Sequence, residues 1–256
     1  WSSSSQDGSS WGVYGQHLDS RGATLGEEFQ INSYTSSEQR MPSVSALEDG
    51  GFIVTWMDSS GHSGGSSWDV RGQLYDGAID PVGEEFRVNS YTSSNQYNPE
   101  VVGLKDGGFV VAWRDTSGHD GGSSNDVWAR VFNADGTESA EEFRVNADHY
   151  SGSQYQPSVG ALSNGDFVVA WRDDSGGSHN DGTGTGSGYD VWARILNADG
   201  TEVVDEFRVN SYTSSSQYEP EVVGLKGGGF VVTWRDDSGH DGGSGADIWA
   251  QMYSND

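Results

Sequence analysis

The stretch that decides the fold is "PEVVGLKDGGFVVAWRDTSGHDGGSSNDVWARVFNADGT", which runs from Pro99 to Thr137. It contains three short apolar runs, "PEVVGL", "FVVAW" and "DVWARVF", separated by clusters of Gly, Asp, Asn and Ser. Runs of this length that are rich in β-branched and aromatic residues are typical of β-strands. The Asp-Gly pairs supply the positive φ that tight hairpins need. The stretch therefore predicts three antiparallel strands, joined first by a tight turn and then by a long glycine-rich loop.

The same pattern recurs along the chain. A preceding strand, "EFQIN" or "EFRVN", starts at Phe29, Phe86, Phe143 and Phe207, with spacings of 57, 57 and 64 residues. Each repeat also carries a glutamine three residues before a proline, and a tryptophan at the end of the "FVVAW" run. These positions are Gln39, Gln96, Gln154 and Gln217; Pro42, Pro99, Pro157 and Pro220; and Trp56, Trp113, Trp171 and Trp234.

The repeats predict an all-β fold in one domain, residues 1–256. We divide it into a partial unit, 1–26, and four units at about 27–83, 84–140, 141–204 and 205–256. Four units of four antiparallel strands, each of about 57 to 64 residues, predict a four-bladed β-propeller. A β-solenoid and two packed sandwiches are the alternatives. "SWGVYGQHLD" (Ser10–Asp19) is a surplus fifth copy of the last strand of a unit.

In a meander of antiparallel strands, alternate connections lie at the same end of the sheet. The two long loops of each unit should therefore share one face, where we expect function. We expect the repeated tryptophans to lie in the core, because large aromatic side chains mostly supply buried area. The few arginines should pair with neighbouring carboxylates.

Composition excludes several partners. The chain has 39 acidic and 13 basic residues, a formal net charge of −26, which repels nucleic acid and anionic membranes. It has no cysteine and no apolar run long enough to span a bilayer, so we expect neither disulfides nor membrane insertion.

Aspartates gather in the long loop that follows each repeated tryptophan. Hard cations such as calcium prefer several oxygen ligands, and glycines let a loop turn its carbonyl groups inward. The predicted calcium ligands are Asp58, Asp69, Asp115, Asp120, Asp126, Asp173, Asp181, Asp190, Asp236, Asp241 and Asp247. The alternative is that these aspartates cap turns through hydrogen bonds to the backbone.

Histidines and tyrosines in the same loops are candidates for ligand binding, because aromatic faces beside polar groups suit sugar rings. The candidates are His62, His119, His240, Tyr91, Tyr155, Tyr212 and Tyr218. Each histidine could instead contact its own loop, and each tyrosine could pack over a blade end. A catalytic centre needs differently tuned groups, whereas repetition provides nearly the same set in every loop. The insertion in the third unit, at 180–188, is the exception.

The repeat as a whole, "P-x-V-x-x-L-x-D-G-G-F-V-V-x-W", then "D-V-W-A-R-x-F-N-A-D-G-T" and "E-F-R-V-N", resembles tandem repeats of very large secreted or surface bacterial proteins. Those proteins are of the hemolysin-type calcium-binding and adhesin-like kind. The resemblance covers nearly the whole chain and implies propeller-type modules outside the cell, associated with calcium. It brings no catalytic residues.

Together these features predict a secreted or cell-surface, calcium-associated β-propeller that binds a glycan or cell-surface ligand and is not an enzyme. One alternative is a structural spacer in a giant adhesin with no ligand of its own. A polysaccharide-active or peptide-active enzyme is the other.

Overall fold

The computed structural model describes residues 1–256 except 7, 9, 66, 123–124, 148–151, 176–187, 240–241, 243–244 and 255–256. The described residues form strands β1 to β18 and two single 3-10 turns, η1 (His62–Gly64) and η2 (His119–Gly121). Neither turn, nor any other helical segment among these residues, has the length and apolar character to cross a bilayer. The prediction of an all-β fold is confirmed.

The strands form five antiparallel sheets. The first contains β1 (Ser2–Ser4), β2 (Trp11–Gly15) and β3 (Phe29–Gln30). The second contains β4 (Gln39–Ala46), β5 (Phe52–Asp58), β6 (Asp69–Tyr75) and β7 (Pro81–Arg87), and the third contains β8 (Gln96–Gly103), β9 (Phe109–Asp115), β10 (Asp126–Phe132) and β11 (Phe143–Arg144). The fourth contains β12 (Gln154–Ala161), β13 (Phe167–Asp173), β14 (Asp190–Leu196) and β15 (Glu202–Arg208), and the fifth contains β16 (Gln217–Gly224), β17 (Phe230–Asp236) and β18 (Asp247–Tyr253).

The sheets do not coincide with the sequence repeats. Each four-stranded sheet takes three strands from one repeat and its fourth strand, the one that carries "EFRVN", from the next repeat. The surplus strand copy near the start of the chain is β2, which pairs with β1 and β3 in a sheet of its own. The prediction of four blades is therefore corrected to five sheets, because the surplus strand pairs locally instead of completing another blade.

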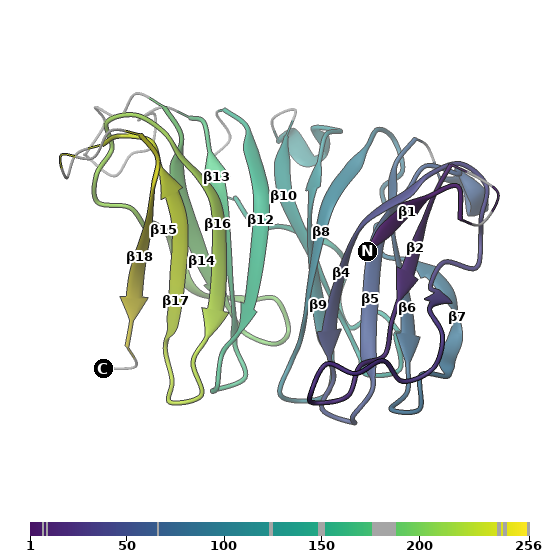
Figure 1. The fold of residues 1–256 in the computed structure, drawn as a ribbon. Coiled ribbons are helices and arrows are strands. Elements are labelled where there is room, and N and C mark those ends of the chain that lie inside the picture. Colours follow the sequence, from purple (N-terminus) through teal and green to yellow (C-terminus); the bar gives the residue numbers. More distant parts are fainter. Residues whose placement is uncertain are drawn as a thin grey trace.

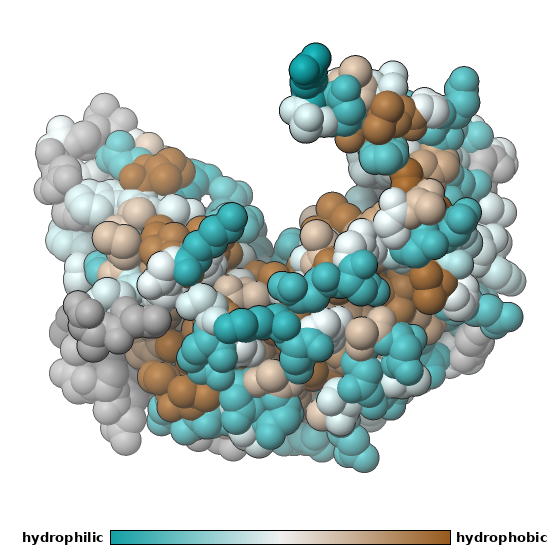
Figure 2. Space-filling model, turned by 90° about the horizontal axis from the view of Figure 1, so that it is seen from below, coloured by the Kyte–Doolittle hydropathy of each residue, from teal (hydrophilic) through white to brown (hydrophobic). Residues whose placement is uncertain are grey.

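The five sheets stand side by side in an open arc (Figures 1 and 2). The first strands of successive complete repeats, β4, β8, β12 and β16, pack against each other around the centre of the arc. Hydrogen bonds join them directly, for example from the Gly103 amide to Ser45 Oγ (2.9 Å) and from the Val222 amide to Ser158 Oγ (3.0 Å). The arc therefore has a concave side lined by β4, β8, β12 and β16.

The two kinds of connection lie at opposite ends of the sheets (Figure 1). At one end are tight hairpins such as Leu104–Gly108, where Gly107 has φ +93° and a Cβ on Gly108 would approach the Phe132 carbonyl oxygen to 2.5 Å. At the other end the two long loops of each repeat are joined, as by the hydrogen bond from the Thr116 amide to the Asn95 carbonyl oxygen (3.0 Å). The prediction that the long loops share one face is confirmed.

The core lies between neighbouring sheets, so both faces of an inner sheet are covered. Every residue of β10 is buried, and Trp56, Trp113 and Trp171 are at most 1% exposed. Their assignment to the core is confirmed. Replacing one such tryptophan with alanine typically destabilises a protein by about 3–5 kcal/mol, because a large cavity remains.

Candidate functional site

Most of the predicted calcium ligands belong to a buried polar network that joins adjacent sheets. In the second complete repeat, Asn89 Nδ2 donates to Asp69 Oδ1 (3.0 Å) and to Gln96 Oε1 (3.3 Å), and Gln96 Nε2 donates to Asp115 Oδ2 (2.8 Å). Asp69 begins β6 and Asn89 follows the end of β7, both strands of the second sheet, whereas Gln96 and Asp115 lie on the first two strands of the third sheet. Asp115 also caps the loop that follows it, because its Oδ1 accepts a hydrogen bond from the Ser117 amide (2.7 Å).

The network is repeated along the chain. Asn32, Gln39 and Asp58 form it in the first repeat; Asn146, Gln154, Asp126 and Asp173 in the third; and Asn210, Gln217, Asp190 and Asp236 in the fourth. Buried polar side chains that are fully hydrogen-bonded rigidify a structure and specify one packing. The carboxylates of this network are therefore engaged in hydrogen bonds within the protein, as the alternative to calcium binding expects.

The other predicted calcium ligands lie elsewhere. Asp120 is exposed within η2, and Asp247 is exposed at the start of β18. Asp181 and Asp241, like the candidate ligand residue His240 and most of the insertion in the third unit, fall outside the described residues. Calcium binding by these loops stays a prediction.

Two of the four candidate tyrosines are part of a ladder of alternating arginine and tyrosine side chains. The Arg114 guanidinium lies 5.2 Å from the ring centroid of Tyr155, and that of Arg172 lies 4.4 Å from the same ring. Arg172 and Arg235 in turn lie over Tyr218, at 5.5 and 5.4 Å. Tyr155 and Tyr218 thus contribute cation–π contacts between blades.

The remaining tyrosine candidates lie at the loop face, where Tyr91 is 39% and Tyr212 is 40% exposed. The expectation that arginines pair with carboxylates holds for Arg130 with Glu138 (2.7 Å) and for Arg194 with Glu202. It also holds for Arg235 with Asp237 (3.0 Å). Arg114 and Arg172 stack on tyrosine rings instead.

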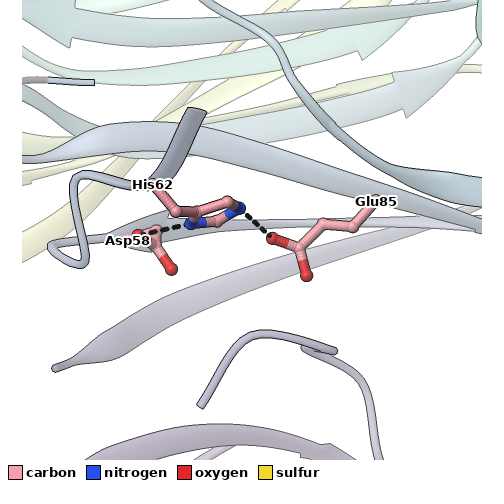
Figure 3. A group of neighbouring side chains, drawn as sticks. All are labelled: Asp58, His62 and Glu85. Atoms are coloured by element: carbon pink, nitrogen blue, oxygen red, sulfur yellow. Dashed lines mark ion pairs between the residues drawn. The ribbon is translucent and has the colours of Figure 1, made fainter. Parts of the chain in front are cut away.

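The candidate residue His62 lies between two carboxylates (Figure 3). Its Nδ1 is 3.7 Å from Asp58 Oδ1, and its Nε2 is 3.4 Å from Glu85 Oε1. The ring stacks on Tyr34 with a centroid separation of 4.1 Å. Asp58 ends β5 and Glu85 lies on β7, so the cluster joins a loop to both a central and an outer strand of one sheet. These three residues form the His62 cluster.

A groove opens beside the His62 cluster, between the first and second sheets. It encloses about 880 Å³ and is lined by Phe29, Tyr34, His62, Gln73, Glu84 and Glu85, among others. In the next two repeats an arginine, Arg130 or Arg194, occupies the position of Gln73. Arg130 donates a hydrogen bond to the Val88 carbonyl oxygen (3.0 Å). The shorter Gln73 donates to its own hairpin, to the Leu74 carbonyl oxygen (2.9 Å), and leaves the space open.

The concave side of the arc carries a second group of polar residues, at a bulge in each first strand. The residue before each repeated proline has φ of +52°, a left-handed conformation that non-glycine residues rarely adopt: Met41, Asn98, Gln156 and Glu219. The ladder register shifts at the same place. Strained residues of this kind are concentrated at functional sites.

Directly after each of these prolines, serine and glutamate alternate around the arc: Ser43, Glu100, Ser158 and Glu221. Ser43 Oγ donates to Glu100 Oε2 (3.0 Å), and Ser158 Oγ donates to Glu221 Oε2 (3.3 Å). Glu221 is exposed, whereas Glu100 on β8 is half-buried beside β4. Burial raises the pKa of Glu100 to about 7, the nearby Glu221 charge adds to this rise, and the Ser43 hydrogen bond opposes it. Glu100 can therefore hold a proton near neutral pH.

Sequence reasoning missed Glu100, Glu221 and Glu85. Glu100 and Glu221 each directly follow a repeated proline. Alignment of the repeats shows serine and glutamate alternating at this position. Glu85 precedes a strand phenylalanine, and its local pattern indicates only a strand residue. Its place beside His62 depends on the pairing of β7 with β6, which no local pattern shows.

No protein-family model matches the chain, and no curated protein sequence matches it either. Solved structures do share its fold. One is an endo-arabinase from Bacteroides thetaiotaomicron, with a TM-score of 0.52 and 11% identity, covering 91% of this chain and 83% of that one. Another is an α-L-arabinanase of Penicillium chrysogenum in complex with arabinobiose, with a TM-score of 0.52 and 16% identity, covering 80% of this chain and 63% of that one. A third is a Hadza microbial sialidase, with a TM-score of 0.55 and 14% identity, covering 83% of this chain and 44% of that one.

These neighbours correct two predictions. The sequence predicted a calcium-associated, lectin-like or adhesin-like module that is not an enzyme, whereas the neighbours with this fold are glycoside hydrolases. The physical error was to treat the repeats as equivalent: at the concave side their chemistry alternates, so one carboxylate can differ from the next. The resemblance to hemolysin-type repeats and the location outside the cell stay predictions.

Proposed function

We propose that the protein is a carbohydrate-active enzyme that hydrolyses glycosidic bonds on the concave side of the arc. The observation that carries the proposal is the pair Glu100 and Glu221, two carboxylates at the same position of two repeats, of which one is half-buried and the other exposed. Glycosidases use one protonated carboxylic acid and one ionised carboxylate, and burial is the usual way to keep the acid protonated.

Glu100 is the proposed general acid. With a pKa of about 7, its carboxyl group can carry a proton at neutral pH and donate it to the oxygen of the leaving sugar. The Ser43 hydroxyl fixes the carboxyl group through Oε2. Glu221, which is exposed on β16, is the proposed second carboxylate, with Ser158 as its matching hydroxyl partner. The related fold of two arabinan-cleaving enzymes supports a glycan as the substrate.

The test is release of reducing sugar from a panel of polysaccharides that includes arabinan, with a sialoside as a separate substrate. We expect Glu100→Gln to lower kcat by at least about 100-fold, because general acid catalysis typically contributes 10²–10⁴-fold. We expect the wild-type rate to fall above pH 7, where Glu100 loses its proton. The control is Glu84→Gln, a change at an exposed glutamate on β7. Full activity of Glu100→Gln, or no activity of the wild type on any substrate, would refute the proposal.

A further inference from the structure

The proton arrangement around His62 can be worked out from its neighbours. Ser60 Oγ donates its hydrogen to Asp58 Oδ1, which also accepts from the Ser60 amide (2.8 Å). The same Oγ lies 2.6 Å from His62 Nδ1, and because its own hydrogen is already used, it accepts from Nδ1–H. A neutral imidazole has one N–H, so its Nε2 carries a lone pair. That lone pair faces Glu85 Oε1 at 3.4 Å.

Glu85 Oε1, which faces His62 Nε2, is also a hydrogen-bond acceptor. The Glu85 side chain is only 5% exposed, and its Oε2 accepts from the Ser33 amide (3.0 Å) and from Ser33 Oγ (2.9 Å). Its Oε1 is buried and has no hydrogen-bond donor among the described residues. A buried carboxylate oxygen that faces the lone pair of a half-buried imidazole is unfavourable unless a cation lies between them.

We propose that His62 Nε2 and Glu85 Oε1 bind a divalent transition-metal ion of the Zn²⁺ class. Zn²⁺ binds histidine nitrogen and carboxylate oxygen at about 2.0–2.2 Å, so two tetrahedral ligands lie about 3.3–3.5 Å apart. The observed 3.4 Å fits this spacing. The ligand set of nitrogen and oxygen suits zinc better than calcium, which prefers oxygen alone.

Asp58 and Ser60 act as positioning residues in this site. A carboxylate that fixes the tautomer of a ligating histidine through its other ring nitrogen is the common outer-shell partner of a metal site. Asp58 does so through Ser60, and Gln39 Nε2 holds the other Asp58 oxygen (3.0 Å). One ligand atom from each of Asp58, His62 and Glu85 lies within 4.8 Å of the other two. The groove beside the cluster leaves room for water in the open coordination positions.

The next repeat contains Asp115, Ser117, His119 and Glu142 with the same hydrogen bonds around its serine, but it lacks the open pair of acceptors. His119 Nε2 lies 3.9 Å from Glu142 Oε1, and this oxygen already accepts a hydrogen bond from the Tyr91 amide (3.1 Å). Trp128 stacks on the His119 ring at 3.9 Å, on which Tyr91 also stacks. The His119 cluster is therefore closed, and it provides a matched control within the same chain.

The experiment measures Zn²⁺ binding to the chelator-treated chain of residues 1–256 by isothermal titration calorimetry at pH 7.5. We expect His62→Asn and Glu85→Gln each to lower the number of bound zinc ions by one, whereas His119→Asn and Glu142→Gln leave it unchanged. Ser60→Ala should keep the site but weaken it about 10–100-fold, the usual effect of removing an outer-shell partner. Circular dichroism without metal verifies that each variant is folded, and if His62→Asn is not, Glu85→Gln decides.

A second readout is Co²⁺ substitution, which gives visible absorption in a low-coordinate site with a nitrogen ligand. We expect this absorption in the wild type and its loss in Glu85→Gln. Failure of the wild type to bind Zn²⁺ would show that only a proton lies between His62 Nε2 and Glu85 Oε1, and it would overturn the proposal. An equal loss in the His119→Asn and His62→Asn variants would also overturn it. Zinc binding is measured without any glycan, so it succeeds or fails independently of the proposed hydrolase function.

Discussion

Replacing Glu100 with glutamine should make the protein more stable at alkaline pH and leave it unchanged at acidic pH. The pKa of Glu100 is raised from its ordinary value of 4.5 to about 7, mainly by burial. At about 1.4 kcal/mol per pKa unit, this rise corresponds to about 3 kcal/mol. The glutamine has the same shape and keeps an oxygen for the hydrogen bond from Ser43 Oγ. The Glu100→Gln substitution therefore removes the titratable carboxyl group and changes little else.

The sign follows from which form the folded state prefers. Folding favours the protonated carboxyl of Glu100, so its contribution to stability is fully present below pH 4.5 and is lost as the pH rises through about 7. Glutamine does not titrate, so the Glu100→Gln variant does not suffer this loss. We expect its free energy of unfolding to match that of the wild type at pH 4.5 and to exceed it by about 2–3 kcal/mol at pH 8.

The assay is urea denaturation at pH 4.5 and pH 8, with the difference between variant and wild type taken at each pH. Other carboxylates titrate in both proteins, so they cancel from that difference. Glu84→Gln, at an exposed glutamate, serves as control and should give nearly no difference at either pH. A difference for Glu100→Gln that is the same at both pH values would refute the reasoning. The same variant should lose hydrolase activity, so gained stability with lost activity is the combined signature.

Three further substitutions test the packing between sheets. Gln96→Leu should lower the free energy of unfolding, measured by denaturant titration, by about 3 kcal/mol, because Asn89 and Asp115 each lose a buried hydrogen-bond partner. The control Gln251→Leu, at an exposed site, should lower it little. Arg172→Leu should cost about 1–2 kcal/mol by the same measurement, since the guanidinium stacks on Tyr155 and Tyr189 at 4.4 Å each, and the exposed Arg21→Leu is its control. Tyr75→Phe should lower the unfolding free energy by about 1 kcal/mol by removing the hydrogen bond from its hydroxyl to the Ile31 carbonyl oxygen. Because the pKa of Tyr75 is raised to about 12, this cost should not change up to pH 9.

The strands and the two kinds of connection were predictable because both depend on local chemistry. The "FVVAW" runs became β5, β9, β13 and β17, and the Asp-Gly or Asn-Gly pairs became hairpins at one end of the sheets. How strands are divided among sheets was not predictable from the repeat boundaries. "EFRVN" completes the preceding sheet because its asparagine donates to an aspartate of that sheet, as Asn89 does to Asp69. That contact spans 20 residues and has no signature in a single repeat.

The candidate sites were less predictable, for a physical reason. Sequence reasoning singled out the aspartates, His62 and the tyrosines, but it could not tell a buried hydrogen-bonded aspartate from an exposed one. Asp115 and Asp120 are five residues apart in the same repeat, yet Asp115 is 1% exposed whereas Asp120 is exposed. The side chains of Gln96 and Ser117 converge on Asp115 only in the folded chain.

Function in a repeat protein depends on where the repeats differ, because identical surroundings give every copy the same protonation state and the same ligands. Two departures in this chain change surroundings without changing the backbone. Glutamate alternates with serine after the repeated prolines, which places one half-buried acid beside β4 and one exposed carboxylate on β16. Gln73 replaces an arginine, which opens a groove beside Glu85, whereas the space at Arg130 is filled. At both positions the next repeat carries the other residue, so a variant at the changed site and its counterpart in the next repeat separate chemistry from folding.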